Sequence, residues 1–204
     1  MARNSTAKGK IARRFGVNIY GNPKYDRLLK KKPHPPGEPK KGRIRQTEYA
    51  RQLAEKQKVK WAYGLSERQF RNLFYKAKTQ KGVTGHNMLI LLERRLDNVV
   101  YRLGMATSRS QARQLVSHGH ILLNERKVTV PSAVVRPGDK ISVKQKKGTT
   151  ELVRSLLAEN ASRPVPPWLS VSKDDMVGTV EVMPARDMIP TVAEEQLIVE
   201  FYSK

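Results

Sequence analysis

The sequence predicts an α+β protein that begins with an irregular basic arm. Five of the twelve prolines fall within residues 1–45, where apolar residues show little periodicity. From residue 47 to residue 119, apolar residues recur at the spacing of amphipathic helices, and from residue 120 the period changes to two, as in strands. The expected order is therefore an arm, then helices, then short strands with further helical segments.

Positive charge is graded along the chain. Lys and Arg number 40 and Asp and Glu 18, which gives a net charge of +22. Residues 1–83 carry a net +18, residues 84–147 a net +8, and residues 148–204 a net −4. A folded domain with so much like charge repels itself unless a polyanion neutralises it. The gradient predicts that one face binds nucleic acid and that the acidic end faces a protein neighbour.

The composition excludes several classes of protein. No run of 18 apolar residues occurs, and no apolar segment follows the N-terminus as in a secretory signal, so we expect no membrane span and a cytoplasmic protein. With no cysteine and four histidines, neither disulfides nor a metal site is expected. An acidic membrane surface is an alternative partner for the charge. However, the densest basic runs lie among Pro and Gly rather than on an amphipathic helix.

The arm comprises residues 1–45. Proline blocks helix interiors and sheet ladders, so the arm is predicted to be extended or irregular and to become ordered on its partner. Its Lys and Arg residues favour phosphate contacts, because each such contact releases counterions. A solvated tail without specific contacts is the alternative.

Two capped helices are predicted after the arm. Thr47 can cap the first, which Gly64 ends, and Ser66 with Gln69 forms a capping box at the start of the second. The aromatic residues of the second helix recur at helical spacing, so we expect them in the core rather than stacked on bases. Basic residues outnumber acidic ones on the polar faces, which favours phosphate contact over mere solvation. The candidate RNA-binding residues here are Lys56, Lys58, Arg68 and Arg71.

A third helix is predicted from about residue 86 to residue 103, with Gly104 as its stop. Ser108 and Gln111 then form another capping box, and the helix that they open ends at Gly119. The later elements are expected to be strands at 120–123, 127–130, 140–143 and 177–183, a turn at 124–126, a helix at 151–159, a Pro-rich joint at 163–169, and an acidic, apolar segment at 192–202.

Residues 94–124 combine two basic helices with a hairpin. A helix N-terminus offers unpaired N–H groups to phosphate, and Arg109 and Arg113 lie one turn apart on the same face of the second helix. At the level of sequence, a DNA-binding helix-turn-helix unit shows the same pattern of two helices. The deep, narrow major groove of RNA does not admit such a helix, so in an RNA-binding protein the helix would contact the RNA backbone instead. The candidate RNA-binding residues here are Arg94, Arg102, Ser108, Arg109, Arg113, Gln114, His118 and Asn124.

Several longer motifs carry a family resemblance. They are Glu55-Lys56-Gln57-Lys58-Val59-Lys60, Glu67-Arg68-Gln69-Phe70-Arg71-Asn72, Leu96-Asp97-Asn98-Val99-Val100-Tyr101-Arg102, Ala112-Arg113-Gln114-Leu115-Val116-Ser117-His118, and the tail Leu197-Ile198-Val199-Glu200-Phe201-Tyr202-Ser203-Lys204. Together they resemble the bacterial family of the fourth small-subunit ribosomal protein, which contains the RNA-binding fold named after it. The resemblance covers roughly residues 45–204.

The resemblance implies a domain organisation and a function. Residues 46–85 would form a small helical domain that the C-terminal segment, residues 184–204, completes. An RNA-binding α/β domain, residues 86–183, would be inserted into it. The family also implies direct binding to small-subunit rRNA at a helical junction, where the protein nucleates assembly of the subunit body.

The resemblance further implies two partners besides rRNA. The side away from the junction would meet the fifth small-subunit ribosomal protein and influence translational accuracy, with Glu194, Glu195 and Tyr202 as candidate interface residues. Lys41, Arg43 and Arg45 would help to line the channel through which mRNA enters the subunit. Many relatives bind zinc through cysteines of the arm, but this chain has no cysteine, so no metal and no cofactor is carried over.

Two other classes share the same RNA-binding fold. Pseudouridine synthases carry their catalytic aspartate in an Arg-Leu-Asp motif, which this chain has at residues 95–97. However, a salt bridge on the helix surface explains Asp97, and no further domain is large enough to hold a flipped base. A heat-shock or stalled-subunit rescue factor is the other alternative. The helical domain and the matching C-terminal tail argue against it. His118 and His120 have no third ligand at metal-binding spacing. We therefore expect no enzymatic activity and no catalytic residues.

Overall fold

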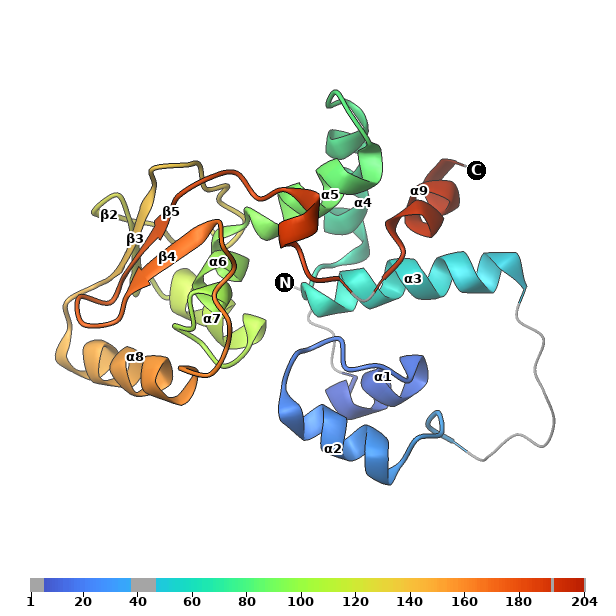
Figure 1. Cartoon of the computed structure of the whole chain (residues 1–204), viewed down its shortest axis with the longest axis horizontal. Coiled ribbons are helices and arrows are strands. Elements are labelled where there is room, and N and C mark those ends of the chain that lie inside the picture. The colour runs from blue at the N-terminus through green and yellow to red at the C-terminus, as the bar shows by residue number, and fades with distance from the viewer. Residues whose placement is uncertain (1–5, 38–46, 192, 204) are drawn as a thin grey trace. The chain divides into compact units, whose positions relative to one another are not determined.

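The computed structural model describes residues 6–37, 47–191 and 193–203, and it confirms an α+β fold (Figure 1). The chain divides into two compact units. We call Met1–Met88 with Thr191–Lys204 the helical unit, and Leu89–Pro190 the sheet unit. The chain leaves the helical unit within α5 (Thr84–Glu93) and returns to it after Pro190.

The basic N-terminal stretch contains two short helices that its prolines did not suggest. They are α1 (Lys8–Phe15) and α2 (Pro23–Lys31), and the described backbone around them is irregular. Pro23 occupies the first turn of α2, where a missing N–H costs nothing, and the side chain of Asn22 caps the helix by accepting a hydrogen bond from Lys24 N at 2.9 Å. A proline count alone therefore misjudges this segment.

Three further helices form the core of the helical unit: α3 (Glu48–Ala62), α4 (Glu67–Lys78) and α9 (Glu195–Ser203). Thr47 caps α3, and the capping box of Ser66 and Gln69 at the start of α4 is present as predicted. The last helix packs against α3 (Figure 1), and its Tyr202 ring stacks on that of Phe74, with 4.6 Å between centroids. The closing acidic, apolar segment is thus largely a helix that completes this core.

The single helix predicted for residues 86–103 is wrong. Arg95 is extended, with ψ of 135°, and it separates α5 from α6 (Leu96–Arg102). The segment 131–133, which follows the predicted hairpin, stabilises this break, because Leu96 N donates to Ala133 O at 2.8 Å and Asp97 N donates to Pro131 O at 3.1 Å. Helical periodicity cannot reveal such a break, since the compensating carbonyl groups lie far along the chain.

The sheet unit is built on five antiparallel strands in the order β2-β1-β3-β5-β4. The strands are β1 (Ile121–Leu123), β2 (Arg126–Lys127), β3 (Lys140–Val143), β4 (Leu169–Ser172) and β5 (Val177–Val180). Asn124 and Glu125, with φ of 49° and 66°, make the predicted hairpin turn. The partner strand β2 is shorter than the predicted 127–130. No strand was predicted at β4, which begins at the last residue of the Pro-rich joint.

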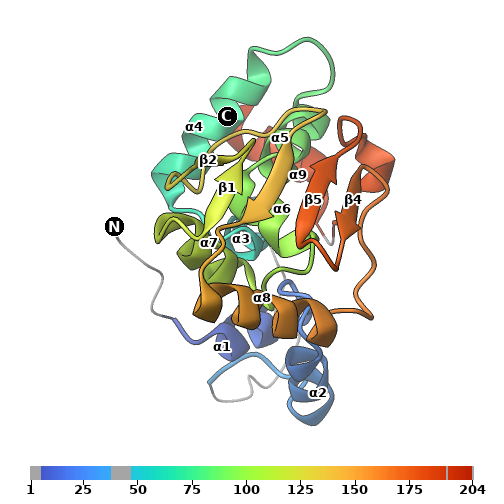
Figure 2. The ribbon, with the colours of Figure 1, turned by 90° about the vertical axis from the view of Figure 1, so that its left-hand side faces the viewer.

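Helices cover the sheet unit and close its core. Figure 2 shows the strands in front of α6, with α8 (Lys147–Glu159) across their ends. That helix begins at Lys147, four residues before the predicted start. The short 3-10 helix η1 (Arg186–Met188) precedes the return to the helical unit. Residues of α6, α7 (Arg109–Ser117), α8 and the strands pack around the fully buried Trp168.

Candidate nucleic-acid interface

In the helical unit, Lys56 and Lys60 are basic residues of a polar helix face, but both form salt bridges with Glu67. Lys56 is only 5% exposed, and its Nζ lies 2.7 Å from Glu67 Oε1 and 4.4 Å from the centroid of the Phe201 ring. Lys60 Nζ lies 2.9 Å from the other Glu67 oxygen. Burial alone would raise the pKa of Glu67, but hydrogen bonds and charges from the two lysines outweigh it and lower that pKa from 4.5 to about 2. Lys56 therefore stabilises the fold.

The remaining candidates of the helical unit differ in exposure. The Nζ of Lys58 lies 2.5 Å from Glu55 Oε1, and both side chains are largely buried. Arg68 and Arg71 are exposed on α4. Of the four candidates in this unit, these two arginines are the exposed ones.

In the sheet unit, a buried polar network joins α5, α6 and α7. Glu93 is 1% exposed, and it accepts hydrogen bonds from Arg102 Nη2 at 2.7 Å and Nε at 3.0 Å and from Asn98 Nδ2 at 2.8 Å. Asn98 Oδ1 in turn accepts from Arg109 Nε at 2.8 Å. Arg102 and Arg109 were predicted on an RNA surface, whereas the structure places their guanidinium groups within the protein's own network.

The Tyr101 ring contacts two guanidinium groups, those of Arg109 and Arg163, each 4.5 Å from its centroid. Arg163 also donates hydrogen bonds to the carbonyl oxygens of Tyr101, Ala106 and Thr107. This arginine thereby fixes the backbone that leads into α7. Sequence reasoning missed it because it stands in the Pro-rich joint, with no periodic signal.

The salt bridge expected for Asp97 exists, but it is buried rather than on a helix surface. Arg95 binds the carboxylate with two nitrogens, Nε at 3.1 Å and Nη2 at 2.8 Å, and both side chains are 7% exposed. Arg113 Nη1 lies 3.7 Å from the same carboxylate. Asp97 therefore anchors the start of α6 and orients Arg113.

Two other candidates make local bonds within the sheet unit. Arg94 Nε donates to Val135 O at 3.0 Å, and burial, with the charge of Arg136, lowers the arginine's pKa. Ser108 caps α7, because its hydroxyl accepts a hydrogen bond from Gln111 N at 3.3 Å. The Gln111 side chain, in contrast, accepts from Thr107 N and not from Ser108 N, so only half of the predicted capping box forms.

Asn124 holds the hairpin turn. Its Nδ2 donates to Asp139 Oδ1, and its Oδ1 accepts from Lys140 N, both at 2.8 Å. The side chains of Gln114 and His118, in contrast, are exposed at the last turn and C-cap of α7.

The acidic C-terminal candidates lie at a shallow cavity of the helical unit. Glu194 and Glu195 line about 450 Å³ together with Val83, His86 and Val199, and Glu195 Oε1 lies 3.7 Å from His86 Nε2. Tyr202 instead faces its own fold, because its hydroxyl donates to Glu67 Oε1 at 3.1 Å. Lys41, Arg43 and Arg45, the residues expected near mRNA, lie outside the described residues.

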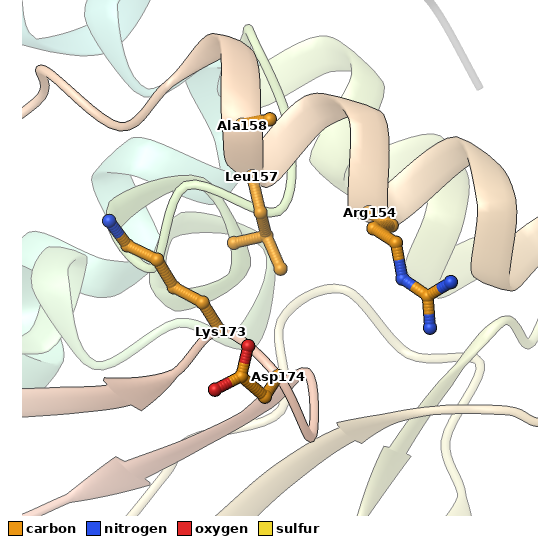
Figure 3. A pocket seen from close by; sticks show the side chains of 5 residues that line it. All are labelled: Arg154, Leu157, Ala158, Lys173 and Asp174. Carbon is orange, nitrogen blue, oxygen red and sulfur yellow. The ribbon is translucent and has the colours of Figure 1, made fainter.

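An open cleft of about 400 Å³ lies in the sheet unit, between α8 and the β4–β5 turn. Figure 3 shows Arg154 and Lys173 extending in different directions, with Asp174 between them. These side chains do not converge on one point as a catalytic set would. Within the described part of the chain, no cluster of three or more His, Cys, Asp or Glu residues could hold a metal ion. No described helix is long and apolar enough to cross a membrane.

Two protein families match consecutive stretches of the chain. The family described as the ribosomal protein S4/S9 N-terminal domain matches residues 3–93, and the S4 domain matches residues 94–141. The network of Glu93, Asn98, Arg102 and Arg109 thus begins at the boundary of the S4 domain and continues into it.

Full-length relatives agree with both matches. The chain is 54% identical to small ribosomal subunit protein uS4 of Borreliella burgdorferi (strain ZS7) and 55% identical to that of Borrelia hermsii (strain HS1 / DAH). The protein of the same name from Borreliella afzelii (strain PKo) is 49% identical. Each alignment covers 100% of this chain and 99% of the relative. The chain therefore belongs to the uS4 family of small ribosomal subunit proteins and carries the RNA-binding S4 domain.

Proposed function

We propose that the chain is a structural component of the small ribosomal subunit that binds small-subunit rRNA directly at a helical junction and nucleates assembly of the subunit body. Its family membership over the full length carries this proposal, and the net charge of +22 supports it, since a polyanionic partner relieves the self-repulsion of so much like charge. In this role the protein positions RNA and catalyses no reaction.

The residues proposed to contact RNA are exposed or partly exposed polar side chains, and those of each unit form the proposed RNA surface of that unit. Arg68 and Arg71 belong to the helical unit, and Gln114 and His118, with the partly exposed Arg113, belong to the sheet unit. The other candidates of the sheet unit act indirectly, by holding α6, α7 and the hairpin in shape. They are Arg94, Arg102, Ser108, Arg109 and Asn124. Lys56 is left out because it is buried, and Lys58 is left out because it is paired with Glu55.

We further propose that the acidic end meets the fifth small-subunit ribosomal protein and thereby affects translational accuracy. Glu194 and Glu195 border a cavity that also offers apolar side chains, a combination that suits a basic and apolar protein segment. Tyr202 contributes by keeping α9 in place. Lys41, Arg43 and Arg45 are proposed to lie near the path of incoming mRNA on the strength of the family resemblance alone.

Two measurements test the proposed function. The native protein should co-sediment with small ribosomal subunits at salt concentrations that strip loosely bound proteins. The purified full chain should also bind a small-subunit rRNA transcript in the presence of excess tRNA. Absence from the subunit, or binding that tRNA abolishes, would contradict the proposal, since affinity for any polyanion would then explain the charge.

A further inference from the structure

Two histidines and three lysines gather where α7 ends, where β1 begins opposite the end of β2, and where the chain passes from β3 into α8. His118 and His120 flank Gly119, and their ring centroids lie 6.0 Å apart. Gly119 has φ of 69°, and a Cβ added there would overlap Lys127 Cε and lie 3.2 Å from its Nζ. Glycine therefore lets the Lys127 side chain lie over the backbone between the two histidines.

Two more lysines reach the same place from other elements. Lys144 N donates to His120 O at 2.8 Å, and Lys146 is the residue before α8. Lys127, Lys144 and Lys146 are all exposed, as is His118. The first turn of α8 reads Lys147-Gly148-Thr149-Thr150 and contains no carboxylate. The fold thus collects positive charge from three separate segments.

The environment of His120 favours its neutral form in the free protein. Burial lowers the pKa of this imidazole, and His118, Lys146, Lys144 and Lys127, in that order, lower it further. The Nδ1 atom lies 3.2 Å from Thr149 Oγ1. A hydroxyl can donate to the neutral ring or accept from the protonated one, so the hydrogen bond suits both states.

The end of the helix explains only the backbone of these residues. Gly119 N donates to Val116 O at 2.9 Å, and His120 N donates to Leu115 O at 3.0 Å. Any residue at position 120 could make the same backbone bond. The helix terminus therefore does not account for the two imidazole rings.

We propose that His118, His120, Lys127, Lys144 and Lys146 form a site for RNA backbone phosphates that takes up a proton when RNA binds, so that affinity for rRNA rises as the pH falls. The proposal rests on the proposed function, because rRNA is its ligand. Bound phosphates offset the repulsion between the lysines and a protonated His120. The imidazolium then becomes the favoured form and adds a contact of its own.

The direction of the pH effect follows from this difference. The free site favours the neutral ring and the bound site favours the charged ring, so binding takes up a proton between the two titration points. Linkage then makes the association constant rise by up to about tenfold per unit fall in pH for each proton taken up. Imidazole is the side chain that ordinarily titrates between about pH 5 and pH 8, so the effect falls in that range.

The test measures binding of the full chain to a small-subunit rRNA transcript by fluorescence anisotropy, from about pH 5.5 to pH 8 at constant ionic strength. The unmodified protein should bind more tightly as the pH falls, and H118Q/H120Q should lose most of this dependence. The matched control is H86Q, which removes a histidine beside the acidic cavity of the helical unit, outside the proposed RNA surface, and should behave as the unmodified chain does. In NMR spectra of the unmodified protein, the His120 titration should move to higher pH when the transcript is added, a readout that needs no variant.

The outcomes separate the two proposals. If the unmodified chain binds rRNA specifically but with no pH dependence, or if H118Q/H120Q keeps that dependence, the proton-linked site is wrong and the proposed function stands. A His120 titration that does not move in the complex would overturn the site in the same way. If tRNA displaces the transcript equally well at every pH, the proposed function itself fails, and the site loses its ligand.

Discussion

The helical unit and the sheet unit use their positive charges in different ways. In the helical unit, salt bridges to Glu55 and Glu67 engage Lys56, Lys58 and Lys60. In the sheet unit, Arg95 and Arg102 are paired with buried carboxylates, whereas the lysines around His120 are exposed. The planar guanidinium group suits buried, bidentate pairs better than the compact ammonium group does. Pairing, and not the number of charges, therefore separates cations that stabilise the fold from cations that can bind RNA.

The largest expected effect lies in the buried network of the sheet unit. Glu93→Ala removes the acceptor of three side-chain hydrogen bonds from Asn98 and Arg102. Breaking a buried pair from one side typically costs about 3–5 kcal/mol. Native-state hydrogen exchange should therefore show a loss of that size in the opening free energy of α6 and α7.

The matched control for this variant is Glu151→Ala, which removes an exposed glutamate of α8 and should change the same free energy by less than about 0.5 kcal/mol. Equal protection of α6 and α7 in both variants would show that the Glu93 network is not a structural element. Arg102 and Arg109 would then return to the set of direct RNA contacts.

A somewhat smaller loss is expected in the helical unit. Tyr202→Ala removes a ring that stacks on Phe74 and a hydroxyl that bonds to Glu67. Because the ring is only partly buried, we expect a loss of about 2 kcal/mol, below the range for fully buried aromatics. Tyr202→Phe keeps the stack and should cost about 1 kcal/mol or less. Hydrogen exchange of α3 and α4 measures both, and a Tyr202→Ala variant as protected as the parent chain would refute the internal role of this residue.

Acid sensitivity tests the paired lysines of the helical unit through Glu67, their shared partner. The pKa of Glu67 is about 2 in the folded protein and 4.5 ordinarily, so its stabilising contribution is complete above pH 4.5 and is lost as the pH falls toward 2. The effect is smaller than the two above, since Glu67 is half exposed and water screens its charge. Thermal unfolding of the parent chain and of Glu67→Gln should differ at pH 6 and converge below about pH 2.5. A constant difference down to the lowest pH would contradict the assignment.

The smallest effect on RNA binding is expected at the acidic end. E194K/E195K reverses two charges beside the cavity of the helical unit and leaves the proposed RNA surface intact. Affinity for the rRNA transcript should stay within about twofold, whereas binding to the fifth small-subunit protein in a reconstituted particle should weaken. Weaker binding to naked rRNA would place the acidic end on the RNA side instead.

Local signals in the sequence predicted local features well. Thr47, the Ser66–Gln69 box and Ser108 cap helices as expected, because a cap depends on residues within one turn. The turn at Asn124 was likewise foreseeable, since asparagine tolerates positive φ. The α2 helix was missed because prolines were counted without regard to the position that Pro23 takes in a first turn. The α1 helix contains no proline and was missed because the whole stretch was judged by its proline count.

Features that depend on distant partners could not be predicted in the same way. The break at Arg95 needs backbone acceptors from Pro131 and Ala133, and nothing around residue 95 indicates them. The same holds for the candidate site. Lys56 and Arg68 look alike on a helical wheel, yet only Lys56 meets both Glu67 and the Phe201 ring once α9 has folded back onto α3. Exposure of a cation is decided by tertiary contacts.

Two triple variants that remove the same amount of charge test whether pairing decides which cations bind RNA. K127Q/K144Q/K146Q removes exposed lysines of the sheet unit, and K56Q/K58Q/K60Q removes paired lysines of the helical unit. The measurement is the slope of the logarithm of rRNA affinity against the logarithm of salt concentration, at a temperature where both variants are folded. We expect the first variant to flatten the slope by about three units, one for each phosphate-binding lysine removed, and the second to keep the parent slope. Equal flattening in both variants would contradict the role of pairing.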